Sequence, residues 1–429
     1  MKIKPLYQLF IKCKGICTDT RKITGGEMFF ALKGPNFNAN QLAMSALESG
    51  CAYAVVDEVI EGADSGRLIH VEDVLTTMQQ LANFHRKQFD ITVIGITGSN
   101  GKTTNKELIN AVLSKQYNVL CTKGNLNNHI GVPLTLFELN ATHELAIIEM
   151  GANHVGEIKQ LCEIAAPTNG LITSIGIAHL EGFGSVEGIK KGKKELFDHV
   201  LEHNGICFVN QNADDIPGLY EGTKENAFYY GKPDQPPYAT LDPSNTTLNL
   251  TIHTNQSTLK VRSNLIGDFH LNNILNAFAI GQFFEVNENY IVDAIESYDP
   301  KNNRSQRMDW NNNQVILDAY NANPTSMAAA VRSFISNDAK HKVAVLGDML
   351  ELGRDSQKYH QAIADQLKQY PFDQVILVGE EFKQTQTPEQ YIKFDNTISA
   401  KAYVLDQQFK HKTILVKGSR SIGLEKIFD

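Results

Sequence analysis

The sequence predicts an α/β fold arranged in three domains. Short runs of β-branched and other apolar residues alternate along the chain with segments that repeat apolar residues at helical spacing. A glycine-rich stretch joins one such strand to a helix in "VIGITGSNGKTTNKELINAVL" (93–113). The length of 429 residues favours two to three domains, because a single hydrophobic core rarely grows that large.

Residues 1–85 are expected to form a small α/β domain. Strands are predicted in "EMFFALKG" (27–34) and "CAYAVVDE" (51–58), and a helix is predicted in "VLTTMQQLANFHRKQF" (74–89).

Residues 86–300 are expected to form a central domain built on a parallel sheet. Beyond the strand that precedes the glycine-rich stretch, strand-like runs occur in "NVLCT" (118–122), "LAIIEM" (145–150), "GLITSIGIAHL" (170–180) and "GICFVN" (205–210). A polar stretch at 229–247 leads to the alternating segments "LNLTIHT" (248–254) and "TLKVRSNLIG" (258–267). Those two segments predict a β-hairpin added to the core.

Residues 301–429 are expected to form a Rossmann-like domain behind a linker at 296–310, which is polar and contains Pro300. Strand and helix patterns alternate in "QVILDAY" (314–320), "SMAAAVRSFI" (326–335), "HKVAVLG" (341–347), "QKYHQAIADQLKQY" (357–370), "FDQVILVG" (372–379) and "KTILVKG" (412–418). This alternation is typical of a parallel sheet with helical crossovers.

The glycine-rich stretch resembles a phosphate-binding loop but is shorter than the common form. The pattern G-x-x-x-x-G-K-[ST] requires a glycine where this chain has Ile96. The remaining G-x-x-G-K-T-T comprises Gly98, Ser99, Asn100, Gly101, Lys102, Thr103 and Thr104. A strand before it and a helix after it place free N–H groups and a partial positive charge at the loop, which suits nucleotide phosphates. The alternative is a glycine-rich turn that carries a chance lysine.

Two polar residues close predicted strands near this loop. Glu149 ends "LAIIE" and His179 ends "LITSIGIAH". Ligands bind at the carboxyl ends of strands in open α/β sheets, so both side chains can reach the crevice that holds Lys102. A carboxylate there suits a magnesium ligand. The alternatives are a solvated carboxylate for Glu149 and a merely hydrogen-bonded histidine for His179.

Composition excludes several classes of function. The net charge of −8 disfavours a nucleic-acid partner. The six cysteines form no C-x-x-C pair and predict reduced thiols, neither a disulfide framework nor a zinc site. We find no signal-peptide core and no apolar run of the ~18–20 residues that a membrane span needs. A soluble cytoplasmic protein is expected.

Further motifs resemble those of the Mur ligase family. They are "GITGSNGKTTNKE", "GNLNNHIGVPLTLFEL", "EMGANHVGEI", "AHLEGFGSVEGIKKGKKELF", "ILDAYNANPTSM", "VAVLGDMLELG" and "LVKGSRSIGLEKI". The short phosphate loop is that family's form. The N-terminal "CTDTRKITGGEMFFALKG" is similar to the substrate domain of the member that adds D-alanyl-D-alanine, so the resemblance covers nearly the whole chain.

The resemblance implies an ATP-dependent, ADP-forming peptide ligase of peptidoglycan synthesis. ATP phosphorylates the free carboxylate of a UDP-N-acetylmuramoyl-tripeptide, and the amine of D-alanyl-D-alanine then attacks the acyl phosphate. The first domain is implied to bind the UDP substrate, the central domain ATP, and the third domain D-alanyl-D-alanine. The partners are small molecules, and we expect a monomer.

The resemblance also assigns roles to residues. It implies that the loop from Gly98 to Thr104 binds ATP together with Asn273, Arg307 and Asp318. It implies magnesium ligation by Thr103, Glu149, His179 and a carbamylated Lys193, and a catalytic set of Lys102, Glu149, His179 and Lys193. From the residues alone, the run Lys190, Lys191, Lys193 and Lys194 reads as a solvated helix face.

Substrate contacts follow from motif position. Candidates are Thr20, Arg21, Asn127 and Asn128 for the UDP-sugar substrate, and Tyr320, Asn321 and Asn323 for D-alanyl-D-alanine. Asn323-Pro324 also fits a helix N-cap followed by proline at the first helical position. The chain departs from the family at residues 38–40, which read NAN in place of DGH, and at His270, where the family has asparagine.

Two other functions remain open at this point. One is another acid–amine ligase of the same superfamily, such as a folate polyglutamate ligase, although those enzymes lack an N-terminal domain of this type. The other is a P-loop kinase or switch, which does not need a whole third domain ending in "VKGSRSIGLEKI".

Overall fold

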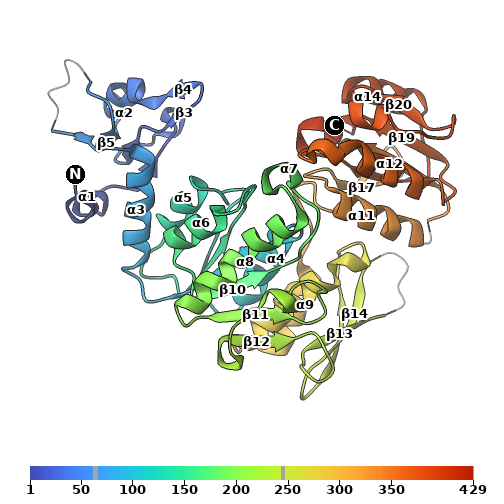
Figure 1. Ribbon diagram of the computed structural model, residues 1–429, viewed down its shortest axis with the longest axis horizontal. Helices are drawn as coiled ribbons and strands as arrows, with labels where there is room; N and C mark the ends of the chain where they lie inside the picture. Colours follow the sequence, from blue (N-terminus) through green and yellow to red (C-terminus); the bar gives the residue numbers. More distant parts are fainter. Residues whose placement is uncertain (61–65, 243–246, 338, 429) are drawn as a thin grey trace.

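The computed structural model describes residues 1–60, 66–242, 247–337 and 339–428. The chain is arranged as lobes along its long axis, with the N-terminus in one outer lobe and the C-terminus in the other (Figure 1). No helix within the described ranges is both long enough and apolar enough to cross a membrane.

The N-terminal lobe contains the predicted strands in a parallel sheet. The strand order is β1-β2-β5-β6, with bounds Ile16–Cys17, Met28–Phe30, Tyr53–Val56 and Leu68–His70. The short strands β3 (Lys33–Gly34) and β4 (Phe37–Asn38) pair separately, and the helices are α1 (Ile3–Phe10), α2 (Ala43–Glu48) and α3 (Val74–Arg86).

Helix α3 connects the first lobe to the central one. The Asp73 carboxylate caps it by accepting a hydrogen bond from the Thr76 backbone N–H at 2.6 Å. Met78 and Leu81 of α3 are fully buried in a core that also includes Leu136 and Leu161 of the central lobe. The two lobes are therefore packed through shared apolar surface.

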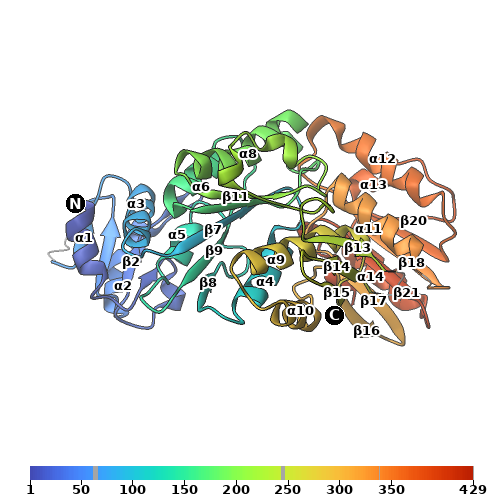
Figure 2. The same cartoon turned by 90° about the horizontal axis from the view of Figure 1, so that it is seen from below.

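The central lobe has a parallel sheet with helices on both faces. The strand order is β12-β11-β10-β7-β9-β8, with bounds Ala227–Tyr230, Ile206–Asn210, Asn169–Ile172, Thr92–Thr97, Leu145–Glu149 and Val119–Cys121. Helices α6 (Glu157–Ala165) and α8 (Val186–Glu202) cover one face, and α4 (Lys102–Leu113) and α9 (Leu271–Phe283) cover the other (Figure 2). Other helices of this lobe are α5 (Gly131–Leu136), α7 (Leu180–Phe183) and α10 (Glu288–Ser297).

The prediction that a strand runs to His179 is wrong. β10 ends at Ile172, and His179 precedes helix α7 in the left-handed conformation with a φ of 52°. The intervening residues leave the sheet and bind the glycine-rich loop. Thr173 Oγ1 donates to the Asn100 carbonyl at 2.6 Å, and Ser99 Oγ donates to the Gly176 carbonyl at 2.9 Å. Apolar composition alone does not distinguish this loop from a buried strand.

The predicted hairpin is confirmed, and it belongs to a larger sheet. β14 (Asn249–His253) pairs with β15 (Thr258–Arg262), and β13 (Tyr238–Leu241) adds to the other edge of β14, all antiparallel. β13 lies inside the polar stretch 229–247, which we had not expected to contain a strand. Residues 243–246 of that stretch lie outside the described residues.

The C-terminal lobe has the predicted Rossmann-like alternation. Its strand order is β16-β17-β21-β18-β19-β20, with bounds Gln306–Trp310, Asn313–Asp318, Thr413–Lys417, Lys342–Gly347, Gln374–Val378 and Ile392–Phe394. The helices are α11 (Pro324–Ser336), α12 (Ser356–Leu367), α13 (Glu380–Lys383) and α14 (Thr397–Asp406). The predicted linker at 296–310 is wrong in its second half, because β16 pairs antiparallel with β17 along the sheet edge.

Candidate active site

A cavity of about 640 Å³ lies where the central and C-terminal lobes meet. The glycine-rich loop, the segments after β9 and β10, and the start of α9 line it from the central lobe. Residues 304–305, 318–329 and Lys417 contribute from the linker and the C-terminal lobe. The cavity thus joins segments that are far apart in the sequence.

The glycines of the loop are required by its conformation. Gly98 has a φ of +149° and Gly101 a φ of +78°, and L-residues with side chains rarely adopt such values. A Cβ on Gly101 would lie 2.7 Å from Asn273 Oδ1, and one on Gly98 would collide with Thr173 Oγ1. Gly101 directly precedes α4, so the helix N-terminus points its free N–H groups into the cavity.

Lys102 lies folded along this loop. Its Nζ donates to the Gly98 carbonyl at 2.6 Å. Burial lowers the pKa of Lys102, while the negative charge of Glu149 acts in the opposite direction. The amine therefore lies against the loop backbone at the edge of the cavity, next to the space where the loop would hold a phosphate.

Glu149 is buried, so the solvated alternative is wrong. Its side chain is 1% exposed, and Oε1 accepts hydrogen bonds from Thr103 Oγ1 at 3.1 Å and Asn127 Nδ2 at 2.8 Å. Within the described structure, Oε2 is buried without a hydrogen-bond partner, and Lys106 Nζ lies 3.9 Å away. A buried carboxylate oxygen without a partner is costly unless a ligand or cation satisfies it.

His179 lines the cavity and bridges the two lobes. Its Nδ1 contacts Glu351 Oε2 of the C-terminal lobe, and the Glu181 backbone N–H donates to the Glu351 carbonyl at 3.2 Å. In this arrangement no three His, Cys, Asp or Glu side chains of the described residues are grouped closely enough to hold a metal ion. The role of His179 as a metal ligand stays a prediction.

Lys193 does not belong to a solvated face. Its side chain is only 2% exposed, whereas Lys191 on the same helix is exposed. Its Nζ donates to the Ala152 carbonyl at 3.3 Å and lies 5.0 Å from the centre of the Phe183 ring. Burial lowers the pKa of Lys193 well below its ordinary value, and the nearby positive charge of Lys102 lowers it further. The neutral amine is a nucleophile, which a surface ammonium is not.

Asn273 is held in a buried polar network. Its Oδ1 accepts from Asn105 Nδ2 of α4 at 2.7 Å, and its Nδ2 donates to His270 Nδ1 at 2.8 Å. His270 Nε2 lies 3.2 Å from Ser305 Oγ of the linker. His270 therefore links Asn273 to the linker through its two ring nitrogens.

The pKa of His270 yields a prediction about stability. Burial lowers this pKa from 6.5 to about 4. Between these values the unfolded chain binds a proton that the folded chain excludes, so the contribution of His270 to folding falls as the pH drops from 6.5 to about 4. Chemical unfolding measures the free energy of unfolding at pH 7 and at pH 4.5. Between these pH values the wild type should lose on the order of 2–3 kcal/mol more of this free energy than His270→Asn does. Equal losses would contradict a buried neutral histidine.

The linker and the C-terminal lobe supply charged groups to the cavity. Asp318 Oδ2 accepts from Lys417 Nζ at 2.6 Å, and Arg304 stacks on Tyr320 with 3.7 Å between the guanidinium carbon and the ring centre. Asn323 Nδ2 donates to Asn100 Oδ1 of the glycine-rich loop at 2.7 Å. Arg307 is not among the described residues that line the cavity; it lies on the edge strand β16 with an exposed side chain.

The remaining predicted residues fall into two groups. Asn127, Asn128, Tyr320 and Asn321 line the cavity. Thr20 and Arg21 lie in a turn of the N-terminal lobe, outside the described cavity lining, where Arg21 pairs with Asp19 at 2.8 Å. That ion pair and its hydrogen bonds lower the pKa of Asp19 to about 2.

Two family models match the chain. "Mur ligase middle domain" covers residues 96–281, and "Mur ligase, glutamate ligase domain" covers residues 303–420. Together they span more than half of the sequence. The chain belongs to the Mur ligase family.

Relatives of this Mur ligase are similar over nearly their whole length. The UDP-N-acetylmuramoyl-tripeptide–D-alanyl-D-alanine ligase of Escherichia coli K12 is 33% identical over 97% of this chain and 93% of its own. A crystal structure of MurF from Acinetobacter baumannii has a TM-score of 0.88 at 31% identity, covering 99% of this chain and 97% of that one. MurF ligase from Thermotoga maritima in complex with ADP shares the fold with a TM-score of 0.84 at 24% identity, covering 97% and 96%.

Sequence reasoning missed several residues of this Mur ligase site. Arg304 lines the cavity, Lys106 lies beside Glu149, and Glu351 contacts His179. None of the three carries a recognisable spacing, because only tertiary contacts bring them to these places. Lys417 had a signal, since it is the last residue of the buried strand β21, and ligands bind at the carboxyl ends of strands in open α/β sheets.

Proposed function

We propose that this chain joins D-alanyl-D-alanine to UDP-N-acetylmuramoyl-tripeptide, with cleavage of ATP to ADP, to form UDP-N-acetylmuramoyl-pentapeptide for peptidoglycan. One structural observation carries the proposal: the phosphate loop and the 318–326 segment of the C-terminal lobe face each other across a single cavity. The near-full-length similarity to D-alanyl-D-alanine ligases supports the same substrates.

The residues suit this chemistry. A carboxylate is a poor electrophile, so phosphorylation must first provide a leaving group. Phosphoryl transfer brings the anionic γ-phosphate against the tripeptide carboxylate, and this repulsion has to be offset. Lys102 and the N–H groups at the start of α4 provide that positive potential, and the facing lobes hold the reactants in line.

We place magnesium beside Glu149. The unpartnered Oε2 of Glu149 and the Thr103 hydroxyl are hard oxygen donors of the kind that Mg²⁺ prefers. The ion would neutralise charge on the transferred phosphoryl group. His179 would join them only after releasing Glu351. Lys193 as a carbamate is a further part of the proposal, and the burial and lowered pKa of its amine support it.

We assign residues 1–85 to the UDP substrate, 86–300 to ATP and 301–429 to D-alanyl-D-alanine. The parallel sheets and the sheet around β14 each fall within one of these spans. Thr20 and Arg21 are placed at the UDP end. We further propose that the protein acts as a cytoplasmic monomer.

Product analysis with different substrate pairs tests the function. With ATP and magnesium, we expect phosphate release only when both UDP-N-acetylmuramoyl-tripeptide and D-alanyl-D-alanine are present, and mass spectrometry should show the pentapeptide. Glutamate with a folate should give nothing, which separates this activity from a folate polyglutamate ligase. Phosphate release from ATP in the absence of both substrates would instead favour a nucleotide-driven switch, and stable transfer of phosphate to another small molecule would favour a kinase.

A matched pair of arginine variants tests whether the lobes must close further. We expect Arg307→Ala to raise the KM for ATP by roughly 10-fold without changing binding of the UDP substrate, because closure would bring Arg307 to the nucleotide. Arg304→Ala is the comparison, since Arg304 already lines the cavity. An effect of Arg304→Ala alone, with an unchanged radius of gyration on adding ligands, would show that the present arrangement is the working one.

A further inference from the structure

A second cavity, of about 280 Å³, adjoins the main one. The two share part of their lining, namely Thr103, Asn125, Arg304 and Tyr320. Among the described lining residues, Arg420 and Glu425 border the second cavity alone. It is therefore a side chamber that opens toward the phosphate loop, and its charged groups that do not line the main cavity are Arg420, Glu425 and Glu107.

The cationic part of the chamber is built on Tyr320. The guanidinium carbon of Arg304 lies 3.7 Å from the centre of that ring, and the guanidinium carbon of Arg420 lies 4.9 Å from it. Such stacking orients a guanidinium and leaves its N–H groups available. In the part of the chain that the structure describes, neither arginine has a carboxylate within ion-pair distance.

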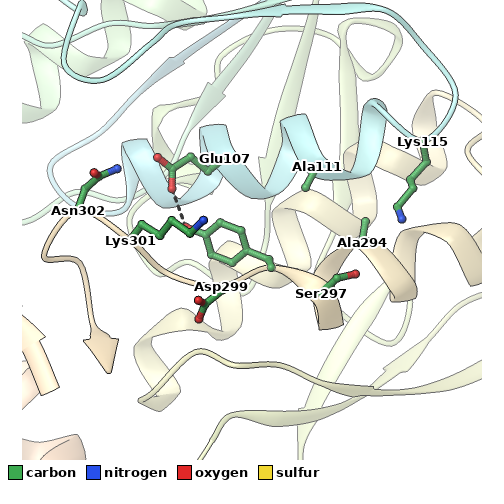
Figure 3. Close-up of a pocket in the computed structure, with 9 residues that line it drawn as sticks. Glu107, Ala111, Lys115, Ala294, Ser297, Asp299, Lys301 and Asn302 are labelled. Atoms are coloured by element: carbon green, nitrogen blue, oxygen red, sulfur yellow. Dashed lines mark hydrogen bonds between the residues drawn. The ribbon is translucent and has the colours of Figure 1, made fainter. Parts of the chain in front are cut away.

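The acidic part consists of Glu107 and Glu425, which differ in their contacts. Glu107 also lines a neighbouring pocket, which lies between α4 and residues 297–302 (Figure 3). Its side chain points toward these linker residues. Its Oε2 accepts from Tyr298 Oη at 2.7 Å. Glu425 Oε2, by contrast, is buried and has no hydrogen-bond partner among the described residues. Glu425 is the acid in the chamber that lacks a donor.

We propose that this chamber binds the incoming D-alanyl-D-alanine, with Arg420 receiving its carboxylate and the Glu425 carboxylate turning its buried Oε2 to accept its peptide N–H. The inference rests on the proposed function and adds the residues that select the second substrate. A zwitterionic dipeptide supplies the carboxylate that the guanidinium lacks and the N–H that the glutamate lacks. The volume suits a small dipeptide, since drug-sized pockets begin at ~300 Å³.

The direction of the dipeptide follows from the shared lining. The reacting amine has to face the main cavity, where Thr103 and the phosphate loop lie. The carboxylate then points away from the loop toward Arg420, which borders the chamber only. Arg304 lines both spaces and lies near enough to affect the charge state of Lys102, so we place it on the phosphate side.

Kinetics of an Arg420→Met variant test the assignment. We expect the KM for D-alanyl-D-alanine to rise roughly 10- to 100-fold, with the KM values for ATP and the UDP substrate within about 2-fold of wild type. The wild type should use D-alanyl-D-alaninamide, which lacks the carboxylate charge, worse by a similar factor. Arg420→Met should use the acid and the amide about equally well. Arg332→Met, an exposed arginine on α11, is the matched control and should behave as wild type.

The outcomes separate this inference from the proposed function. A wild-type protein without pentapeptide formation would refute the function itself. If the wild type is active and Arg420→Met still prefers D-alanyl-D-alanine to its amide, only the dipeptide chamber is refuted. If Arg420→Met raises the KM for ATP alone, Arg420 is assigned to phosphate instead. Glu425→Gln gives a second measurement: its amide oxygen still accepts a hydrogen bond, so it should lose less than Glu425→Ala. Equal kinetics for wild type and Glu425→Ala would remove Glu425 from the site.

Discussion

Lys102→Ala is expected to lower the rate of pentapeptide formation by more than about 10³-fold while leaving the fold intact. Lys102 is the cation of the loop, and its one strong contact in the present structure is the Gly98 carbonyl at 2.6 Å. Its loss removes charge compensation for the transferred phosphoryl group and little packing. Binding of the UDP substrate, which we place at the other end of the chain, should not change.

Phosphate release and circular dichroism, measured together, check this result. Lys115→Ala is a suitable control, because Lys115 follows the same helix and pairs with Asp293 at 2.5 Å on the surface. We expect Lys115→Ala to keep near-normal turnover. Near-normal turnover of a folded Lys102→Ala protein would refute the assignment of the loop to ATP phosphates.

Local patterns predicted much of the fold. Buried parallel strands such as β7 and β9 are continuous β-branched and apolar runs, and this composition marks them without any knowledge of their neighbours. The N-cap at Asn323 was predictable for the same reason. Its side chain accepts from the Ser326 backbone N–H, Pro324 follows it, and the resulting capping box is a property of a few adjacent residues.

The features that sequence did not predict depend on tertiary contacts. The segment after Ile172 is as apolar as a strand, yet its backbone and side chains bond to the phosphate loop. β16 is a polar segment that becomes a strand by pairing with β17 at the edge of the sheet. The periodicity of its own residues does not predict this pairing. Likewise, Arg304 lines the cavity and Arg307 does not, although the two residues are only three positions apart in the sequence.

Lys193 is another residue whose environment the sequence did not predict, and its replacement gives the second large expected effect. Its neighbours in a basic run suggested a solvated face, but the side chain points into the core beneath Ala152. We expect Lys193→Ala to lose at least about 100-fold in activity, because the variant cannot form the carbamate that would supply an anionic oxygen beside magnesium. Formate, acetate or bicarbonate should restore part of the activity by occupying the space that the side chain leaves.

Rescue distinguishes this role from a structural one. Lys193→Ala removes a large buried side chain, so thermal unfolding should be measured beside activity, and added carboxylates should restore activity without having to raise the stability of the variant. The lowered pKa of Lys193 favours the neutral amine over the ammonium, and a neutral amine can attack CO₂ and lose a proton to give the carbamate. Lys191→Ala, on the exposed side of the same helix, should remain active and insensitive to added carboxylates. Full activity of Lys193→Ala without any additive would show that the buried lysine serves only packing, and the metal site would then lack a carbamate.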